Sequence, residues 1–136
     1  MKRLLSVNYS DAVFNVAVLL LRLGSGLLLI TNHGMYKLTH FSEMQNKFYN
    51  FMGLGSGVSL MLALFAETIC SLFIILGLFT RIAALPLVIT MCVVIFGANA
   101  GKAFGDSEMA ILYLISFAFL LLCGPGKISV DAMINK

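Results

Sequence analysis

Charged residues are scarce in this sequence. Only 11% of the 136 residues are charged and 60% are hydrophobic, and the mean hydropathy is +1.00. An average soluble domain is about 25% charged, so this composition excludes a soluble protein and indicates a membrane protein. The formal net charge of +3 is explained by the topology of the chain in a membrane, and we expect no nucleic acid among its partners.

Motifs that hold metals or electron carriers are also missing. Cys70, Cys92 and Cys123 each lie inside an apolar run, with no CxxC and no cysteine–histidine ligand spacing. We interpret them as small buried hydrophobic residues and predict no metal site. The sequence has no haem-attachment motif, no iron–sulfur ligand set and no Rossmann fingerprint. The chain is therefore unable to carry electrons without a partner protein.

Long apolar runs make up more than half of the chain, and they leave no room for a separate soluble domain. The runs cover residues 12–31, 58–79, 82–98 and 109–123. At about 1.5 Å per helical residue, the first two are long enough to cross a hydrocarbon core of about 30 Å. The third and fourth are near the short limit for a span.

The fold class that follows is an all-α membrane protein, a four-helix up-and-down transmembrane bundle formed by one domain, residues 1–136. We expect helices at about 12–32, 58–79, 82–98 and 108–123, with an amphipathic helix at about 40–52 in the first loop. A cleaved signal peptide is the alternative for the amino end, where Lys2 and Arg3 precede an apolar run. No small-residue cleavage site follows, so we interpret this run as a retained helix.

Several residues mark the expected helix ends. Gly77 is placed to end the second helix and Thr80 to cap the third, which predicts a tight antiparallel hairpin. Pro86 falls in the early turns of the third helix, where its missing N–H does little damage. After the fourth run, residues 124–126 read Gly-Pro-Gly, a strong stop signal. The remainder is expected to be a short cytoplasmic tail.

The long first loop carries its own apolar pattern. Phe41, Met44, Phe48 and then Phe51 or Met52 recur at spacings of three and four residues, which is typical of an amphipathic helix. Such a helix either lies in the outer membrane interface with its aromatic face in lipid or caps the bundle, and both remain open. The glycine-rich residues 53–57 are expected to act as a hinge.

Basic residues predict the orientation. One group of them falls in the amino tail, the link between the second and third helices, and the carboxyl tail: Lys2, Arg3, Arg81, Lys127 and Lys136. The opposite loops carry Lys37, Lys47 and Lys102. Five against three favours both termini in the cytoplasm.

One arginine interrupts the first apolar run, in LLLRLGSGLLLI at residues 19–30. A charge near the bilayer centre costs at least a few kcal/mol, so such a residue normally has a partner. Glu67 is the one acidic residue within the four runs. Counted from the expected helix ends, Arg22 and Glu67 both lie about 15 Å deep, which predicts an ion pair. That pair either serves a ligand or proton pathway or only fixes helix register.

Further polar residues are expected toward the outer end. At 100° per residue, Arg22, Gly26, Leu29, His33 and Lys37 fall within about 80° of one another on the first helix. Asn99 closes the third helix, while Asp106 and Glu108 open the fourth, with Ser107 at a capping position. We therefore predict an outward-facing polar pocket for ligand binding, formed by Arg22, His33, Lys37, Glu67, Asn99 and Glu108.

Three of these residues also have simpler interpretations. Lys37 can extend to lipid headgroups, and Glu108 is an acid favoured in the first turn of any helix. His33, near the membrane interface, can be an ordinary hydrogen-bonded histidine. Their convergence on one side of the bundle is what favours a pocket.

Three segments of this sequence resemble the DoxX family, small four-helix bacterial membrane proteins related to the DoxD subunit of thiosulfate:quinone oxidoreductase. They are LLRLGSGLLLITNHGMYKL at residues 20–38, AETICSLFIILGLFTRIAALPL at 66–87, and GDSEMAILYLISFAFLLLCGPGKISVD, which ends at residue 131. The resemblance covers nearly the whole chain and implies the four-helix fold in a bacterial inner, cytoplasmic membrane. Asn99 departs from the family, where a histidine is common at this position, which argues against a site built on paired histidines.

The resemblance implies one function and leaves others open. The first hypothesis is an accessory subunit of a quinone-linked redox membrane system, in which Arg22, Glu67 and His33 contact a non-covalently bound quinone. If it is part of an enzyme, it is then a subunit of an oxidoreductase that carries no electrons itself. The alternative is a non-catalytic module that binds lipid or a small amphiphile, or assists membrane-protein assembly. A small transporter is disfavoured, because four helices leave little room for alternating access. Expected partners are membrane lipids and a redox partner protein, with a homo-oligomer also open.

Overall fold

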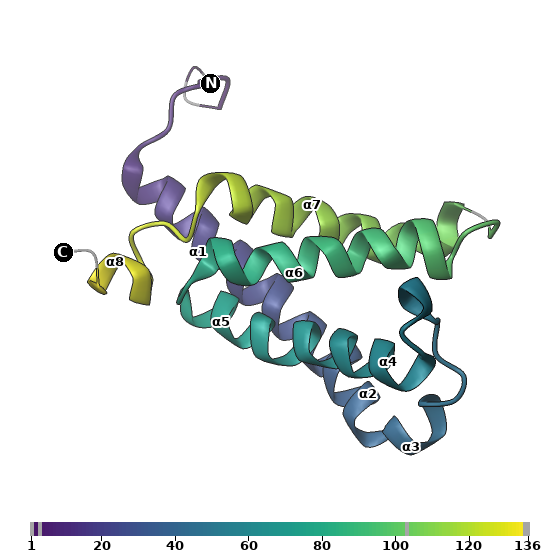
Figure 1. Cartoon of the computed structure of the whole chain (residues 1–136). Coiled ribbons are helices and arrows are strands. Elements are labelled where there is room, and N and C mark those ends of the chain that lie inside the picture. Colours follow the sequence, from purple (N-terminus) through teal and green to yellow (C-terminus); the bar gives the residue numbers. More distant parts are fainter. Residues whose placement is uncertain (1, 3, 103, 135–136) are drawn as a thin grey trace.

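The computed structural model describes residues 2, 4–102 and 104–134, and these residues form helices, turns and loops without a strand. Arg3 and Lys136, two of the residues that predicted the orientation, lie outside this range. Four helical rods run back and forth along one axis (Figure 1). The prediction of an all-α membrane protein is confirmed.

A π-helical segment interrupts each of the first two rods and ends the third. The rods are α1 (Asp11–Leu29), η1 (Ile30–Gly34) and α2 (Met35–Thr39); α4 (Ser56–Phe65), η3 (Ala66–Cys70) and α5 (Ser71–Leu76); α6 (Thr80–Val93) and η4 (Val94–Ala98); and α7 (Glu108–Cys123). The first three are long and apolar enough to cross a membrane, and α7 is a shorter apolar helix. The first rod starts at Asp11, where the Ser10 hydroxyl accepts the Val13 N–H. It continues to Thr39, beyond the predicted end near residue 32.

The predicted helix at 40–52 does not form as one element. The segment contains a single short α-helix, α3 (Phe41–Met44), and a 3₁₀ turn, η2 (Phe51–Gly53). Side chains compete with the helical bonds here: the Asn50 side chain accepts the Gly55 N–H, and the Ser59 hydroxyl accepts the Phe51 N–H. Asn50 is therefore extended, and the chain folds back over the bundle.

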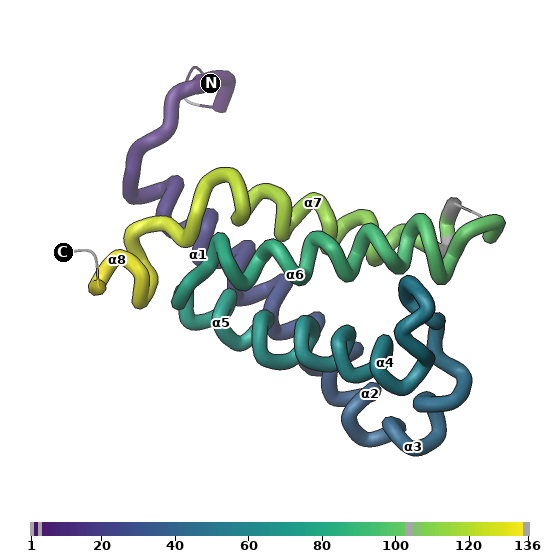
Figure 2. The backbone as a smooth tube through the Cα atoms, viewed as in Figure 1, coloured from purple at the N-terminus to yellow at the C-terminus, as the bar shows by residue number. Residues whose placement is uncertain are grey.

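The rods pack as two pairs. α6 lies beside α7, while α1 lies along α5, and contacts of α1 with α7 and of α5 and η3 with α6 close the bundle. The tube trace in Figure 2 shows that the two pairs diverge toward the end where α3 lies. We call this the α3 end. The opposite α8 end holds the link between α5 and α6 and the short helix α8 (Val130–Ile134).

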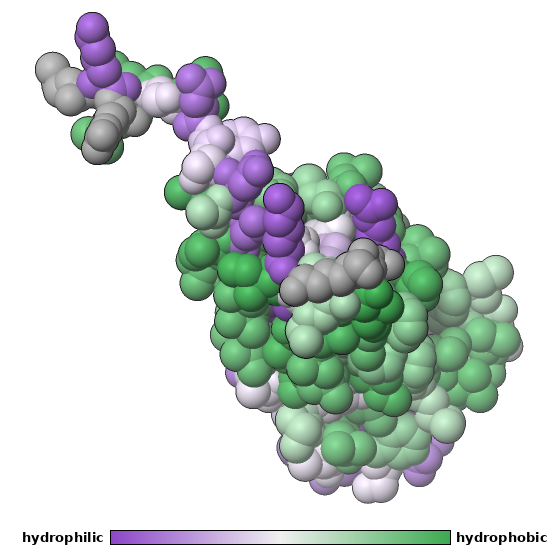
Figure 3. All heavy atoms as spheres, turned by 90° about the vertical axis from the view of Figure 1, so that its left-hand side faces the viewer, coloured by the Kyte–Doolittle hydropathy of each residue, from purple (hydrophilic) through white to green (hydrophobic). Residues whose placement is uncertain are grey.

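A narrow apolar core joins the rods. Its fully buried members include Leu29, Ile74, Leu87, Phe117 and Leu120. Many other large apolar side chains face outward, and Figure 3, which looks onto the α8 end, shows a mainly hydrophobic surface below a group of hydrophilic side chains. An outward apolar surface on this scale is what lipid contact requires.

The link at the α8 end differs from expectation in how it is capped. Gly77 ends α5 in the left-handed conformation, with φ 73°, as predicted. Thr80 does not cap α6: its hydroxyl is buried without a hydrogen-bond partner among the described residues. Asp131 caps the helix instead, because its carboxylate accepts the N–H groups of Phe79 at 2.8 Å and Thr80 at 3.0 Å. The carboxyl tail is thus part of the bundle.

Candidate functional site

Arg22 does not pair with Glu67. Its side chain is 1% exposed and donates to four backbone carbonyl oxygens. The acceptors are Ile74 at 3.0 Å, Ile75 at 3.0 Å, Pro125 at 3.0 Å and Ile128 at 2.6 Å. The first two belong to the last turn of α5, whose carbonyls have no partner within the helix. Arg22 therefore joins α1 to the end of α5 and to the tail.

The depth estimate was wrong because α1 projects past the other rods at the α8 end (Figures 1 and 2). Arg22 is consequently level with the end of α5. The residue level with Glu67 is Gly34, where a Cβ atom would lie 3.0 Å from the Glu67 carbonyl oxygen. From Arg22 to Gly34 the helix rises about 18 Å. Arg22 and Glu67 thus belong to different parts of the bundle.

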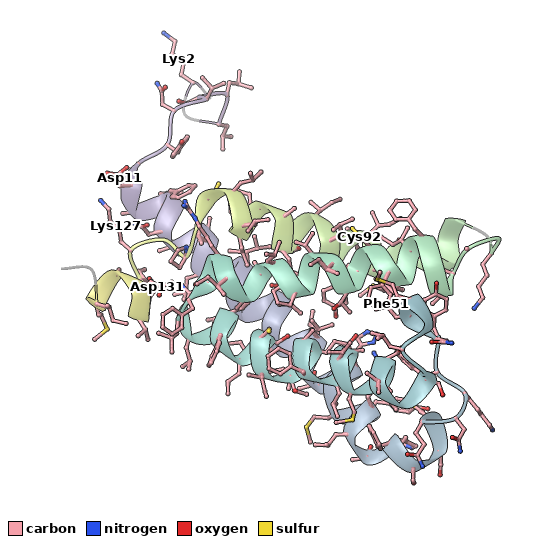
Figure 4. All side chains as sticks on the ribbon, viewed as in Figure 1. Lys2, Asp11, Phe51, Cys92, Lys127 and Asp131 are labelled. Atoms are coloured by element: carbon pink, nitrogen blue, oxygen red, sulfur yellow. The ribbon has the colours of Figure 1, made fainter. Side chains whose placement is uncertain are left out.

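The tail that Arg22 binds is held by several further bonds. The Lys127 N–H donates to the Asn15 side chain at 2.9 Å, and the Asp131 N–H donates to the Gly77 carbonyl at 2.9 Å. Figure 4 shows Lys127 near Asp11 at the start of α1, and Asp131 beside the link between α5 and α6. The three segments that carried the family resemblance therefore meet at the α8 end, where their polar residues have a structural role.

Glu67 forms an ion pair with Lys37 instead. The Lys37 ammonium donates to Glu67 Oε2, and the two side chains are 13% and 3% exposed. Lys37 lies in α2, one turn beyond Gly34, and helical side chains lean toward the amino end of their helix. Its ammonium is thereby directed back to the level of Glu67. Gly34 permits the approach, because a Cβ there would lie 2.8 Å from Thr68 Cγ2.

Two aromatic groups lie near this pair. The His33 ring contacts the Tyr113 ring edge to face, with centroids 5.8 Å apart. Both residues interact electrostatically with Glu67. Tyr113 is 5% exposed, and its hydroxyl has no hydrogen-bond partner among the described residues. His33, Lys37, Glu67 and Tyr113 form what we call the polar cluster.

The π-helical segments coincide with this cluster. His33 lies in η1 and Glu67 in η3, and the two segments are in contact. A π turn contains one more residue than an α turn, and such turns are frequent at functional sites. The added residue rotates every later side chain relative to plain α-helical counting. The predicted stripe from Arg22 to Lys37 nevertheless faces the second rod on both sides of η1, because Arg22 binds the Ile74 and Ile75 carbonyls and Lys37 binds Glu67.

A cavity of about 320 Å³ adjoins the cluster, between α4 with η3 on one side and α6 with η4 on the other. Its walls are mainly apolar: Phe48, Phe51, Leu62, Ala63, Phe65, Leu85, Ile89, Val93 and Val94. Figure 4 shows Phe51 at the α3 end, between α4 and the end of α6. The first loop thus covers the cavity. This corresponds to the second role predicted for the loop, a cap on the bundle.

Lys37 and Glu67 are the charged residues that line this cavity. Ser59 and Thr90 also line it, but their hydroxyls donate to the carbonyls of Gly55 and Pro86, each at 2.7 Å. The Lys37 ammonium lies 5.8 Å from the centroid of the Phe48 ring, within the range of a cation–π contact. The cavity therefore has apolar walls and one strongly polar end.

The remaining predicted residues lie elsewhere. The Asn99 side chain donates to the Ser107 hydroxyl at 3.1 Å, and that hydroxyl makes no capping bond to α7. Glu108 starts α7 with its side chain exposed, and the Asp106 side chain lies outside the described residues. Of the six predicted site residues, the structure brings together His33, Lys37 and Glu67.

Sequence reasoning missed Tyr113 and Asp131. A tyrosine within an apolar span was a usable signal, because its hydroxyl needs a partner when buried. Asp131 is an acidic residue that follows a strong stop signal, in a segment expected to be a short cytoplasmic tail. The cysteines were interpreted too uniformly: Cys70 is buried, but Cys123 is exposed.

Comparisons with known proteins agree with this fold. An uncharacterized protein of Haemophilus influenzae is 27% identical over 101 residues, which cover 71% of this chain and 67% of that protein. No solved structure matches. The sequence model of the DoxX family matches residues 17–100, more than half of the chain, from α1 through η4. The chain therefore belongs to the DoxX family.

Proposed function

We propose that this protein binds a quinone-type lipophile in the cavity beside the polar cluster, as an accessory subunit of a quinone-linked redox system in the bacterial inner membrane. The observation that carries this proposal is the cavity itself, which has apolar walls and the Lys37–Glu67 pair at one end. Sites for lipophilic ligands typically combine apolar lining with a few polar groups that orient the ligand.

The charges of the cluster favour a neutral head group. Lys37 and Glu67 already neutralise each other, so a phosphate would bring an uncompensated charge into a poorly solvated site. A quinone carbonyl can accept from the Lys37 ammonium, and a quinol hydroxyl can donate to the Glu67 carboxylate. One donor beside one acceptor therefore suits both redox forms.

Quinone reduction takes up two electrons and two protons. A redox partner protein must supply the electrons, since this chain has no electron-carrying motif. Glu67 is placed to exchange protons with a head group, and His33 and Tyr113 are the titratable groups beside it. This gives the chain's own residues a part in proton supply.

The binding test uses protein purified in mild detergent and a short-chain benzoquinone, measured by calorimetry. Ala63→Phe fills the cavity and is expected to abolish binding, whereas Leu112→Phe, on the lipid-facing side of α7, leaves it unchanged. Glu67→Gln is expected to weaken quinol binding by about tenfold, the effect of one hydrogen bond to a charged group.

Mass spectrometry of the co-purified lipids separates this proposal from its alternative. A bound quinone supports the redox role. A phospholipid or fatty acid seated in the same cavity, with benzoquinone binding that Ala63→Phe does not alter, would favour the non-catalytic lipid-binding module. Turnover of quinol by the isolated chain would overturn the accessory role.

We further propose that both termini face the cytoplasm, as the basic residues predict. Alkaline phosphatase is active only outside the cytoplasm, so a fusion of this enzyme to the carboxyl terminus is expected to be inactive. An active fusion would reverse the orientation.

A further inference from the structure

A second cavity, of about 530 Å³, lies at the α8 end of the bundle. It is bounded by the first residues of α6, by Cys123 at the end of α7 and Pro125 after it, and by Asp131 and Ala132 of α8. We propose that it binds the head group of an anionic phospholipid, with Arg81 holding the phosphate. Cavities of 300–1,000 Å³ are of the size that binds small molecules.

The charges around this cavity leave Arg81 without a counter-ion. Its side chain is exposed and donates to the Leu122 carbonyl at 3.3 Å. The described part of the chain offers it no carboxylate within ion-pair distance. Lys127, nearby, is paired with Asp11 at 3.8 Å.

Asp131 also lines the cavity, but it does not cancel the charge of Arg81. Its two carboxylate oxygens accept the amides of Phe79 and Thr80, and it interacts electrostatically with the buried Arg22. Both Asp131 oxygens are therefore occupied by backbone donors, and among the described residues no ion pair joins this carboxylate to Arg81. A phosphodiester carries one negative charge, and the planar guanidinium can hold two of its oxygens at once.

The surroundings favour a lipid over free phosphate. Phe79 and Ile82, beside Arg81, are 53% and 71% exposed, and they lie at the first turn of a helix long enough to span the membrane. Acyl chains of a bound lipid can cover these two side chains while its phosphate contacts Arg81.

The test measures lipid binding to the purified full chain in detergent by native mass spectrometry. Phosphatidylglycerol is expected to bind about tenfold more tightly than phosphatidylcholine, and Arg81→Gln to remove this preference. Lys102→Gln, an exposed cation at the α3 end, serves as the matched control and should change nothing. Ala132→Phe fills the cavity without changing its charge and should also abolish phosphatidylglycerol binding. This second variant tests the site independently if Arg81→Gln misfolds.

Cys123 provides an independent readout, because it lines the cavity and is exposed. Peptide-level mass spectrometry should show that phosphatidylglycerol slows its labelling by a maleimide. Equal binding of the two lipids, or undiminished phosphatidylglycerol binding by Arg81→Gln, would overturn the proposal. So would protection of Cys123 by inorganic phosphate alone, since this would identify a site for free anions.

Discussion

Replacing the two members of the Lys37–Glu67 pair should have unequal effects on stability. Lys37→Met leaves a carboxylate that is 3% exposed without its cation, and removing one partner of a buried pair costs about 3–5 kcal/mol. Glu67→Gln leaves an ammonium on a flexible side chain that can turn toward solvent, so it should cost only about 1–2 kcal/mol. The double variant should resemble Glu67→Gln, so the coupling energy should equal the cost of Lys37→Met, about 3–5 kcal/mol.

A second double-mutant cycle tests the separation of Arg22 from Glu67. Arg22→Met removes the hydrogen bonds to four carbonyl oxygens, of which Ile74 keeps the Gly77 N–H as a donor, and it should cost more than about 3 kcal/mol. Because the two residues share no partner, combining Arg22→Met with Glu67→Gln should be additive to within about 0.5 kcal/mol.

Both cycles can be measured by equilibrium unfolding with sodium dodecyl sulfate in mixed micelles, followed by circular dichroism. Lys47→Met, at an exposed position of the first loop, is the control and should change stability by less than about 0.5 kcal/mol. A coupling above about 1 kcal/mol between Arg22 and Glu67, or none between Lys37 and Glu67, would refute the assignment of partners.

The same unfolding assay tests three positions, Gly77, Gly34 and Asp131, and uses Gly53 and Gly24 as controls for the two glycines. Gly77→Ala should cost more than about 2 kcal/mol, because φ is 73° and the new Cβ would lie 2.5 Å from a tail side chain. Its control, Gly53→Ala, has a similar φ of 77° but open space around the new Cβ, so it should cost about 1 kcal/mol. Gly34→Ala should destabilise the protein and weaken benzoquinone binding, because the new Cβ separates the two helices at the polar cluster. Its control, Gly24→Ala, meets nothing within 4 Å and should stabilise the protein by up to about 1 kcal/mol. Asp131→Asn should cost about 1 kcal/mol through the weakened cap of α6. Equal effects within either glycine pair, or no effect at Asp131, would contradict these contacts.

Hydropathy and end signals were enough to locate the spans. The fourth helix was predicted at 108–123 and is Glu108–Cys123, and Gly77 ends the second helix as expected. These features are local, because a membrane-spanning segment must satisfy its backbone hydrogen bonds within itself. The predicted helix at 40–52 failed because side chains of α4 bind its backbone groups: the Ser59 hydroxyl accepts the Phe51 N–H, and the Ser56 hydroxyl donates to the Gln45 carbonyl.

The partners of the buried charges depended on information that no local pattern contains. Arg22 binds carbonyl oxygens, and every residue has a carbonyl, so its acceptors have no signature in the sequence. Counting at 100° per residue placed Arg22 and Lys37 on the side of the first rod that faces the second, but it could not give the axial offset between the two rods.

The sequence by itself determined that this chain spans a membrane with four helices and that a few polar residues must find partners inside it. Tertiary structure alone decided which partners they find. A helix can slide along its neighbour and rotate without changing its own hydrogen bonds, so its register is not fixed locally. Here the axial offset of α1 and the π turns of η1 and η3 bring Arg22 next to the tail and Lys37 next to Glu67.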